Sequence, residues 1–254
     1  MRPAHPVDEA ATMTAARLSA RAAELGLPLL ALLSPRETPP PPANEDPAPD
    51  LAPDLAPDLA PPRAIALFGY DGSDALWRAF STSPEAGDGA PDPLDRWSRR
   101  LGDALAAEFG ARALYPFGGP PYQPFVAWAL EADAVWSSPL GMLVGAGRGL
   151  WVSYRCALAF DRPLAAAPPT RAASPCETCA GQPCRVACPV DAFGPAGYDV
   201  AACAAHLDRP EGEDCRRLGC RARRACPVAS PPAPAQAAFH LAAFRAARKR
   251  DAAP

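Results

Sequence analysis

The sequence predicts an α+β protein in which a sandwich-like α/β domain precedes a small, loop-rich domain organised by cysteine. Two observations predict this fold class. Apolar runs of strand length and helix-like periodicities follow one another between Ala64 and Phe160. Eight of the nine cysteines then fall between Cys176 and Cys226. A segment so rich in cysteine and so poor in long apolar runs is expected to fold around bound metal rather than around a large apolar core.

The N-terminal region is predicted to contain a helix and a short strand. Thr14 to Leu25 has apolar positions at helical spacing and stops at Gly26, as a helix followed by a C′ glycine does. Leu29 to Leu33 is a short apolar run and predicts a strand. Residues 35–62 repeat Pro, Ala and Asp, so we expect a disordered insertion or linker there.

Order is expected to resume at Ala64 to Phe68, a compact apolar run that predicts a buried strand. Asp92 is the predicted N-cap of a helix that starts at Pro93 and ends at Gly110. The apolar face of this helix is predicted to consist of Leu94, Trp97, Leu101, Leu105 and Phe109.

The second half of this block is predicted to contain two more elements and a hairpin. Ala111 to Tyr115 predicts a strand, and Pro124 predicts the start of a helix through Ala132. Met142 to Val144 and Leu150 to Phe160 flank a glycine-rich turn and predict a hairpin or a pair of sheet strands.

These elements divide the chain into five expected regions. They are a helix and short strand at 1–34, the insertion at 35–62, the α/β domain at 63–168, the cysteine-rich domain at 169–230, and a Pro-rich spacer with a basic helix at 231–254.

The cysteines form two runs, and each run ends in a Cys-Pro pair. The first reads Cys176-x2-Cys179-x4-Cys184-x3-Cys188-Pro189, which is close to the C-x2-C-x2-C-x3-C-P run of bacterial ferredoxins. Gln182 and Pro183 are the two residues available as an insertion in its second gap. The second run is looser and contains Cys203, Cys215, Cys220 and Cys226-Pro227. Four and four is the count that two [4Fe–4S] clusters need.

In two-cluster ferredoxins the cysteine before the proline binds the other cluster. We therefore expect the two runs to exchange their last ligands. The first predicted set consists of Cys176, Cys179, Cys184 and Cys226. The second predicted set consists of Cys188, Cys203, Cys215 and Cys220.

Zinc and disulfides are the two alternative uses of these cysteines. Structural zinc sites typically combine separated CxxC pairs and show no preference for a terminal Cys-Pro. Disulfides need an oxidising compartment, and the N-terminus, with Asp8 and Glu9 ahead of any apolar stretch, resembles neither a signal peptide nor a membrane span. A cytoplasmic protein without a membrane segment is therefore expected. The ninth cysteine, Cys156, lies in an apolar run and is expected to be a buried structural thiol.

The charge pattern bears on the partners of the protein. A formal net charge of −3 argues against a general nucleic-acid binder, although it leaves tRNA open as a local partner. Five arginines accompany the second cysteine run: Arg216, Arg217, Arg221, Arg223 and Arg224. They either offset the negative charge of thiolates and clusters or form a docking face for an acidic redox donor or acceptor, such as a flavodoxin or a reductase.

The order of the domains resembles that of epoxyqueuosine reductases and the related cobalamin-dependent reductive dehalogenases. The resemblance rests on an α/β domain, a Gly-rich segment from Ser138 to Trp151, and a two-cluster ferredoxin domain, and it covers about Ala64 to Val228. It implies that cobalamin is a possible cofactor of the first domain. The family's acidic proton donor has no counterpart here, because Tyr115 to Pro124 contains no carboxylate, and the family's Lys-Asn pair is also missing. Tyr115 and Tyr122 are either substitute donors or packing residues.

Three functions remain open at this point. The first is a cytoplasmic ferredoxin-type [4Fe–4S] protein that transfers electrons. The second is a cobalamin-dependent oxidoreductase with an altered active site, and the third is a scaffold whose clusters are only structural. His206 follows Cys203 by three residues and is expected to be a satisfied polar residue, since eight thiolates already complete two clusters.

Overall fold

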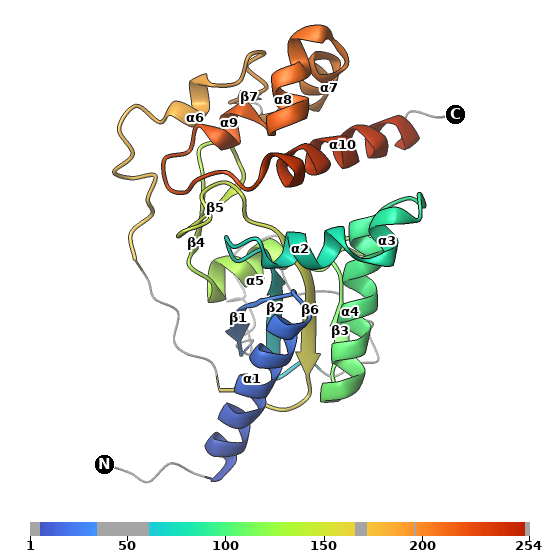
Figure 1. The fold of residues 1–254 in the computed structure, drawn as a ribbon. Coiled ribbons are helices and arrows are strands. Elements are labelled where there is room, and N and C mark those ends of the chain that lie inside the picture. The colour runs from blue at the N-terminus through green and yellow to red at the C-terminus, as the bar shows by residue number, and fades with distance from the viewer. Residues whose placement is uncertain (1–5, 35–60, 166–171, 196, 252–254) are drawn as a thin grey trace. The chain divides into compact units, whose positions relative to one another are not determined.

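The computed structural model describes residues 6–34, 61–165, 172–195 and 197–251, with helix and sheet both present (Figure 1). The insertion expected at 35–62 lies almost wholly outside the described residues, as do Pro168 and Pro169 at the expected domain boundary. The chain divides into two compact units. Unit 1 comprises Met1–Asp71, Ala75–Asp133 and Ser153–Thr170, and unit 2 comprises Gly72–Asp74, Ala134–Val152 and Arg171–Pro254.

Unit 1 is built on a four-stranded antiparallel sheet with the order β1-β2-β6-β3. The strands are β1 (Leu29–Leu33), β2 (Ala64–Gly69), β6 (Tyr154–Phe160) and β3 (Arg112–Leu114). β2 lies between β1 and β6, and all six of its residues are buried. A strand that is covered on both faces needs an unbroken apolar run, which is why this segment does not alternate with polar residues.

Two long helices pack against this sheet and against each other. α1 (Pro6–Glu24) contacts β1 and α4 (Pro93–Phe109), and α4 also contacts β3 and β6. The apolar face predicted for α4 is buried, and Gly110 ends the helix with φ 62°. Asp92 does precede the helix, but its side chain makes no capping hydrogen bond and its φ is 51°. Asp92 therefore occupies the predicted N-cap position, but its side chain does not cap the helix.

Three short helices complete unit 1: α2 (Ala75–Ser81), α3 (Pro84–Gly87) and α5 (Phe125–Ala132). α3 is held to α4 by Arg100, whose guanidinium donates to the Glu85 carboxylate at 2.5 and 3.0 Å. Those hydrogen bonds lower the pKa of Glu85 to about 2, so the carboxylate stays ionised across the physiological range.

Unit 2 combines a small hairpin with a series of short helices. The hairpin pairs β4 (Val135–Ser137) with β5 (Leu143–Gly145), and a second small hairpin pairs β7 (Phe193–Gly194) with β8 (Gly197–Tyr198). The helices are α6 (Pro183–Val186), α7 (Val200–Asp208), the 3₁₀ turn η1 (Pro210–Gly212), α8 (Glu213–Leu218), α9 (Arg221–Arg224) and α10 (Pro234–Asp251). α10 packs against α7 and α8, and Arg245 on α10 bonds to Asp208. The region contains more helix than the expected loop-rich domain.

Of the two alternatives predicted for Met142–Val144 and Leu150–Phe160, the hairpin is wrong, whereas each segment does contribute a sheet strand. β5 pairs with β4 in unit 2, whereas β6 is a central strand of the sheet in unit 1. β6 also begins at Tyr154 rather than at Leu150. The apolar character of residues 150–152 predicts a strand, but two of them pack in unit 2 instead. Leu150 belongs to the buried core of that unit, and the Trp151 ring is covered by the Arg223 guanidinium.

Candidate metal centre

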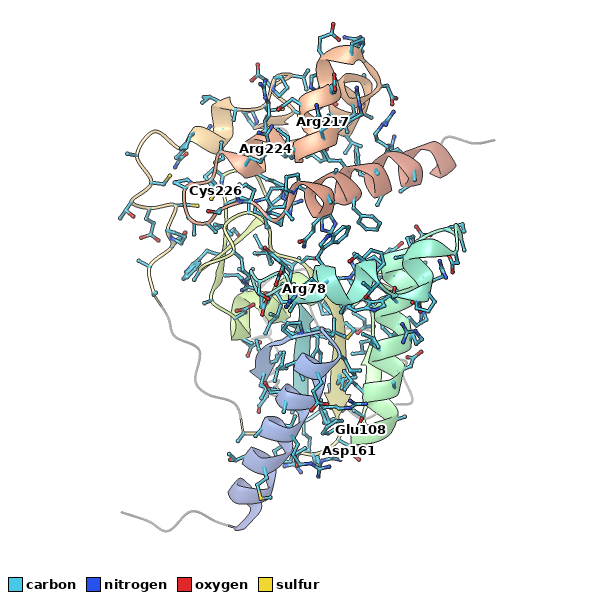
Figure 2. All side chains as sticks on the ribbon, in the orientation of Figure 1. Arg78, Glu108, Asp161, Arg217, Arg224 and Cys226 are labelled. Carbon is cyan, nitrogen blue, oxygen red and sulfur yellow. The ribbon has the colours of Figure 1, made fainter. Side chains whose placement is uncertain are left out.

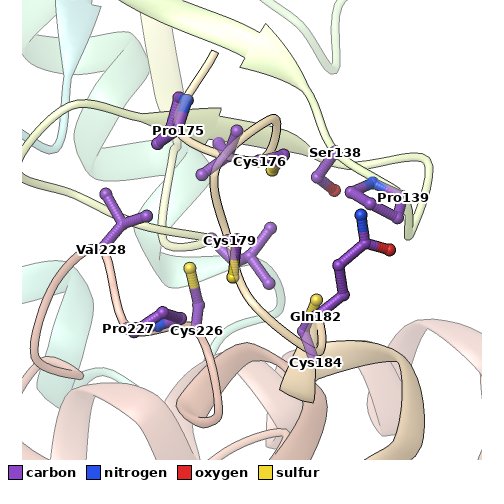
Figure 3. A pocket seen from close by; sticks show the side chains of 12 residues that line it. Ser138, Pro139, Pro175, Cys176, Cys179, Gln182, Cys184, Cys226, Pro227 and Val228 are labelled. Carbon is purple, nitrogen blue, oxygen red and sulfur yellow. The ribbon is translucent and has the colours of Figure 1, made fainter.

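Four cysteines line one pocket in unit 2, and they are the four of the first predicted set. Cys176, Cys179, Cys184 and Cys226 line a hollow that is partly open to solvent (Figure 3). Their sulfur atoms point toward the middle of the hollow, and they arrive from two segments of chain. Cys226 therefore lies in space with the thiols of the first run, although it is the last cysteine of the second run in the sequence.

The local sequence explains how the first run turns around this hollow. The Cys179 amide donates to the Cys176 carbonyl at 3.4 Å, which closes a tight turn between the two thiols. Gln182 then adopts φ 39° and Pro183 starts α6, so the chain reverses and Cys184 faces the same hollow. Gln182 and Pro183, the two residues in excess of the ferredoxin spacing, therefore form the start of a helix.

The β4–β5 hairpin supplies the opposite wall of the pocket, which the sequence analysis did not foresee. Ser138, Pro139, Val144 and Leu150 line it. Gly149 reaches the pocket with φ 53°, and a side chain there would lie 3.4 Å from the Ala229 amide nitrogen and 3.5 Å from the Cys226 sulfur. The Gly-rich segment that resembled a cobalamin-domain feature thus packs against the cysteines. The Pro-flanked apolar turn at residues 138–140, ahead of the cysteine run, is the signal that could have pointed to it.

The second predicted set is also gathered in space, around the start of α7. Burial raises the pKa of the Cys203 thiol, and the neighbouring Cys220, Cys188 and Cys215 raise it further. Asp199 caps α7 by accepting the Ala202 amide at 2.8 Å, which fixes the turn that carries Cys203. The Ala192 amide donates to the Cys188 sulfur at 3.4 Å. Cys188 thus lies with the second run although it closes the first.

The thiol chemistry of both sets suits a metal cluster. Burial raises the pKa of Cys176 and Cys184, and thiols of the same set raise it further. Thiols that are crowded together and shielded from water are costly to ionise unless cationic iron compensates them, and the metal then releases their protons. Cys184, Cys226 and Ala222 belong to the buried core of unit 2, and Cys176, Cys188 and Cys220 pack against that core. The cysteines are therefore core residues of this unit.

The arginines near the second run are mostly engaged in holding its short helices. Arg216 donates to the Leu207 and Arg209 carbonyls at 2.6 and 2.7 Å. Arg221 and Arg224 both bond to Asp214. These contacts tie α8 and α9 together around Cys215 and Cys220.

Arg223 and Arg217 differ from each other in exposure. Arg223 donates to the Leu150 carbonyl at 2.8 Å and stacks 4.1 Å over the Trp151 ring, so it fastens the hairpin to α9. Arg217 is 74% exposed and makes only a loose contact of 3.6 Å with Glu213 (Figure 2). Arg221 is also exposed, at 51%, but it is bonded to Asp214, so Arg217 is the more exposed and the less engaged of these two side chains.

Four other residues singled out from the sequence belong to unit 1 or play a different part from the thiols. Cys156 is fully buried in β6, and burial raises its pKa to about 12, as expected of a structural thiol. Tyr115 is buried and donates to Asp103 at 2.5 Å, whereas Tyr122 is 68% exposed. His206 is buried, and its Nε2 has no hydrogen-bond partner among the described residues, so this nitrogen departs from the expected satisfied polar residue.

Within the described ranges, no three His, Cys, Asp or Glu side chains are placed to share one metal ion. The same residues include no helix long and apolar enough to cross a membrane. Comparison of the chain with protein-family models, curated proteins and solved structures gives no match.

Proposed function

We propose that this chain is a cytoplasmic ferredoxin-type electron-transfer protein that binds two [4Fe–4S] clusters. The observation that carries the proposal is the crossed grouping of the cysteines. Cys226 lines a pocket with three thiols of the first run, while Cys188 neighbours the thiols of the second. Crossed ligation is the arrangement of two-cluster ferredoxins. A structural metal site needs only four thiols and does not require two cysteine runs to exchange a ligand.

The arrangement fits a polynuclear cluster better than a single ion. A zinc site holds each sulfur about 2.3 Å from one metal, so its ligands converge on a point. The four thiols of the first set instead surround a hollow. When bound, the two clusters would supply one-electron transfer. All nine cysteines are free thiols, which suits a reducing compartment.

The residues of unit 2 would hold and shield the two clusters. Val144, Leu150 and Val228 cover the first set with apolar side chains. Cys184 and Cys188 bind different clusters, and the four-residue step between their Cα atoms spans at most roughly 14 Å. This short connection keeps the clusters close enough to exchange electrons directly.

Protein purified without oxygen is expected to contain about eight iron and eight sulfide atoms per chain. It should be brown and give an EPR signal of interacting clusters on reduction. Cys156→Ser serves as the control and should retain all of the iron, because its thiol is buried in the sheet of unit 1. Zinc in place of iron from iron-replete cells, or no metal at all, contradicts the proposal. Tight, stoichiometric binding of cobalamin in an absorbance titration would instead support a corrinoid-dependent reductase.

We further propose that the exposed Arg217 contributes to docking of an acidic redox partner. Arg217→Glu should slow electron transfer from flavodoxin several-fold at low ionic strength and have little effect at high salt, because exposed charges are screened. Iron content should be unchanged, since within the described part of the chain this side chain pairs with Glu213 rather than with a residue near the thiols. Arg63→Glu, an equal charge change at an exposed position in unit 1, is the matched control. Equal rates for Arg217→Glu and the parent at low salt would remove the docking role.

A further inference from the structure

Val186 is 79% exposed, the largest exposed fraction among the large apolar side chains in the part of the chain that the structure describes. It is the last residue of α6 and lies between Cys184 of the first set and Cys188 of the second. Pro189, which follows Cys188, is exposed as well. Single exposed valines are ordinary on protein surfaces, but this one belongs to the short segment that connects the two thiol sets. The chain thus carries apolar surface directly beside a ligand of each proposed cluster.

Exposed positive charge accompanies this apolar surface. α6 contacts α9 and α9 contacts α8, so the three short helices lie together in unit 2 (Figure 1). They carry six arginines, two carboxylates and no lysine. Arg185 precedes Val186 and is exposed, with its Nη1 3.4 Å from Oε1 of Gln182. Arg221 on α9 and Arg217 on α8 are 51% and 74% exposed.

The two carboxylates of these helices are already engaged by arginines of the same helices. Asp214 accepts hydrogen bonds from Arg221 and Arg224. Glu213 lies 3.6 Å from Arg217. Positive side chains therefore outnumber negative ones on the three helices, and a complementary surface on a partner has to be acidic.

We propose that Val186 and the exposed arginines of α6, α8 and α9 form the docking surface for a small acidic redox protein. The inference rests on the proposed function and specifies the partner that supplies its electrons. The matching surface is an apolar edge of the partner's redox group surrounded by carboxylates, because interfaces combine an apolar centre with a polar rim. One electron passes from the partner's redox group, which is oxidised, to one cluster, which is reduced, and no bond forms or breaks. An exposed valine at the centre favours a protein over a nucleic acid, since most contacts to nucleic acids are made with phosphate and sugar.

Val186→Thr tests the apolar contact, because it keeps the branched shape of the side chain and adds no charge. The second-order rate of reduction by flavodoxin, followed by stopped-flow absorbance, should fall roughly threefold at both low and high ionic strength. Val186→Asp should lower the rate roughly tenfold at low salt, because it places a carboxylate against an acidic partner and removes the apolar contact. Reduction by dithionite and the iron content should be unchanged in both variants, since neither removes a cysteine. If Val186→Asp loses iron, the rates of Val186→Thr decide.

Val126→Asp is the matched control, because Val126 is 59% exposed on α5 of unit 1 and the substitution adds the same charge. It should be reduced by flavodoxin at the rate of the parent protein. Parent rates in both Val186 variants, with about eight irons per chain, would overturn the docking surface and leave the proposed function intact. Binding of tRNA that Val186→Asp abolishes would assign the surface to a nucleic acid and would also overturn the inference. Absence of iron from the parent protein would overturn the inference and the proposed function together.

Discussion

Cys226→Ser is expected to abolish the same cluster as Cys179→Ser and to lower the iron content from about eight to about four atoms per chain. The reason is the crossed grouping: Cys226 and Cys179 line one pocket, although they belong to different runs. Cys188→Ser should by the same argument abolish the same cluster as Cys215→Ser. Each pair of variants joins one cysteine from each run.

EPR of the reduced variants, together with iron analysis, checks this expectation. Cys179→Ser and Cys226→Ser should leave one identical residual signal, and Cys188→Ser and Cys215→Ser should leave the other. If the ligands followed sequence order instead, Cys226→Ser would match Cys215→Ser and Cys188→Ser would match Cys179→Ser. That opposite pairing would reject crossed ligation, even in a protein with two clusters. Cys156→Ser should keep both signals.

Removal of iron by a chelator under reducing conditions is expected to unfold unit 2 and to leave unit 1 folded. The core of unit 2 includes Cys184 and Cys226 themselves, with Leu140, Val144 and Leu150 packed around them. Once the metal is removed, the thiols are protonated and hydrated and no longer hold this core together. In a small domain of this kind the metal supplies much of the folding free energy. Unit 1 has a separate apolar core around β2 and β6, where Phe68 and Leu158 are fully buried.

Limited proteolysis with peptide identification measures this effect. New cleavages should fall in 172–195 and 197–251 and also in 134–152, although the last segment lies between two parts of unit 1 in the chain. Protection of 134–152 after iron removal would show that the hairpin folds with unit 1. Leu158→Ala is the reciprocal control, because it leaves a cavity in unit 1 that costs about 2–5 kcal/mol. It should lower the thermal stability of that unit and leave the iron content near eight.

The local sequence pattern predicted those helices and strands whose apolar residues are also the residues that the fold buries. β1 has the predicted bounds Leu29–Leu33, and β2 extends the predicted run by one residue. The buried face of α4 follows the predicted periodicity because a helix packed on one side must repeat its apolar positions every three or four residues. The cysteine spacing predicted two sets with exchanged ligands, and the eight thiols group in space in that way. Their occupation by iron stays a prediction.

Tertiary contacts decided the features for which no local pattern exists. Leu150 and Trp151 are as apolar as the strand that follows them, yet they pack in the cysteine unit, because Arg223 and Cys226 lie there in the folded chain. Four of the five arginines donate hydrogen bonds to backbone carbonyls or to Asp214. The cluster of positive charge in the sequence does not reveal these partners. The stacking of Tyr198 on Phe193 depends on a two-residue ladder too short to leave a periodic signal. Sequence periodicity reports which residues avoid water, whereas only the folded chain determines which distant partners they meet.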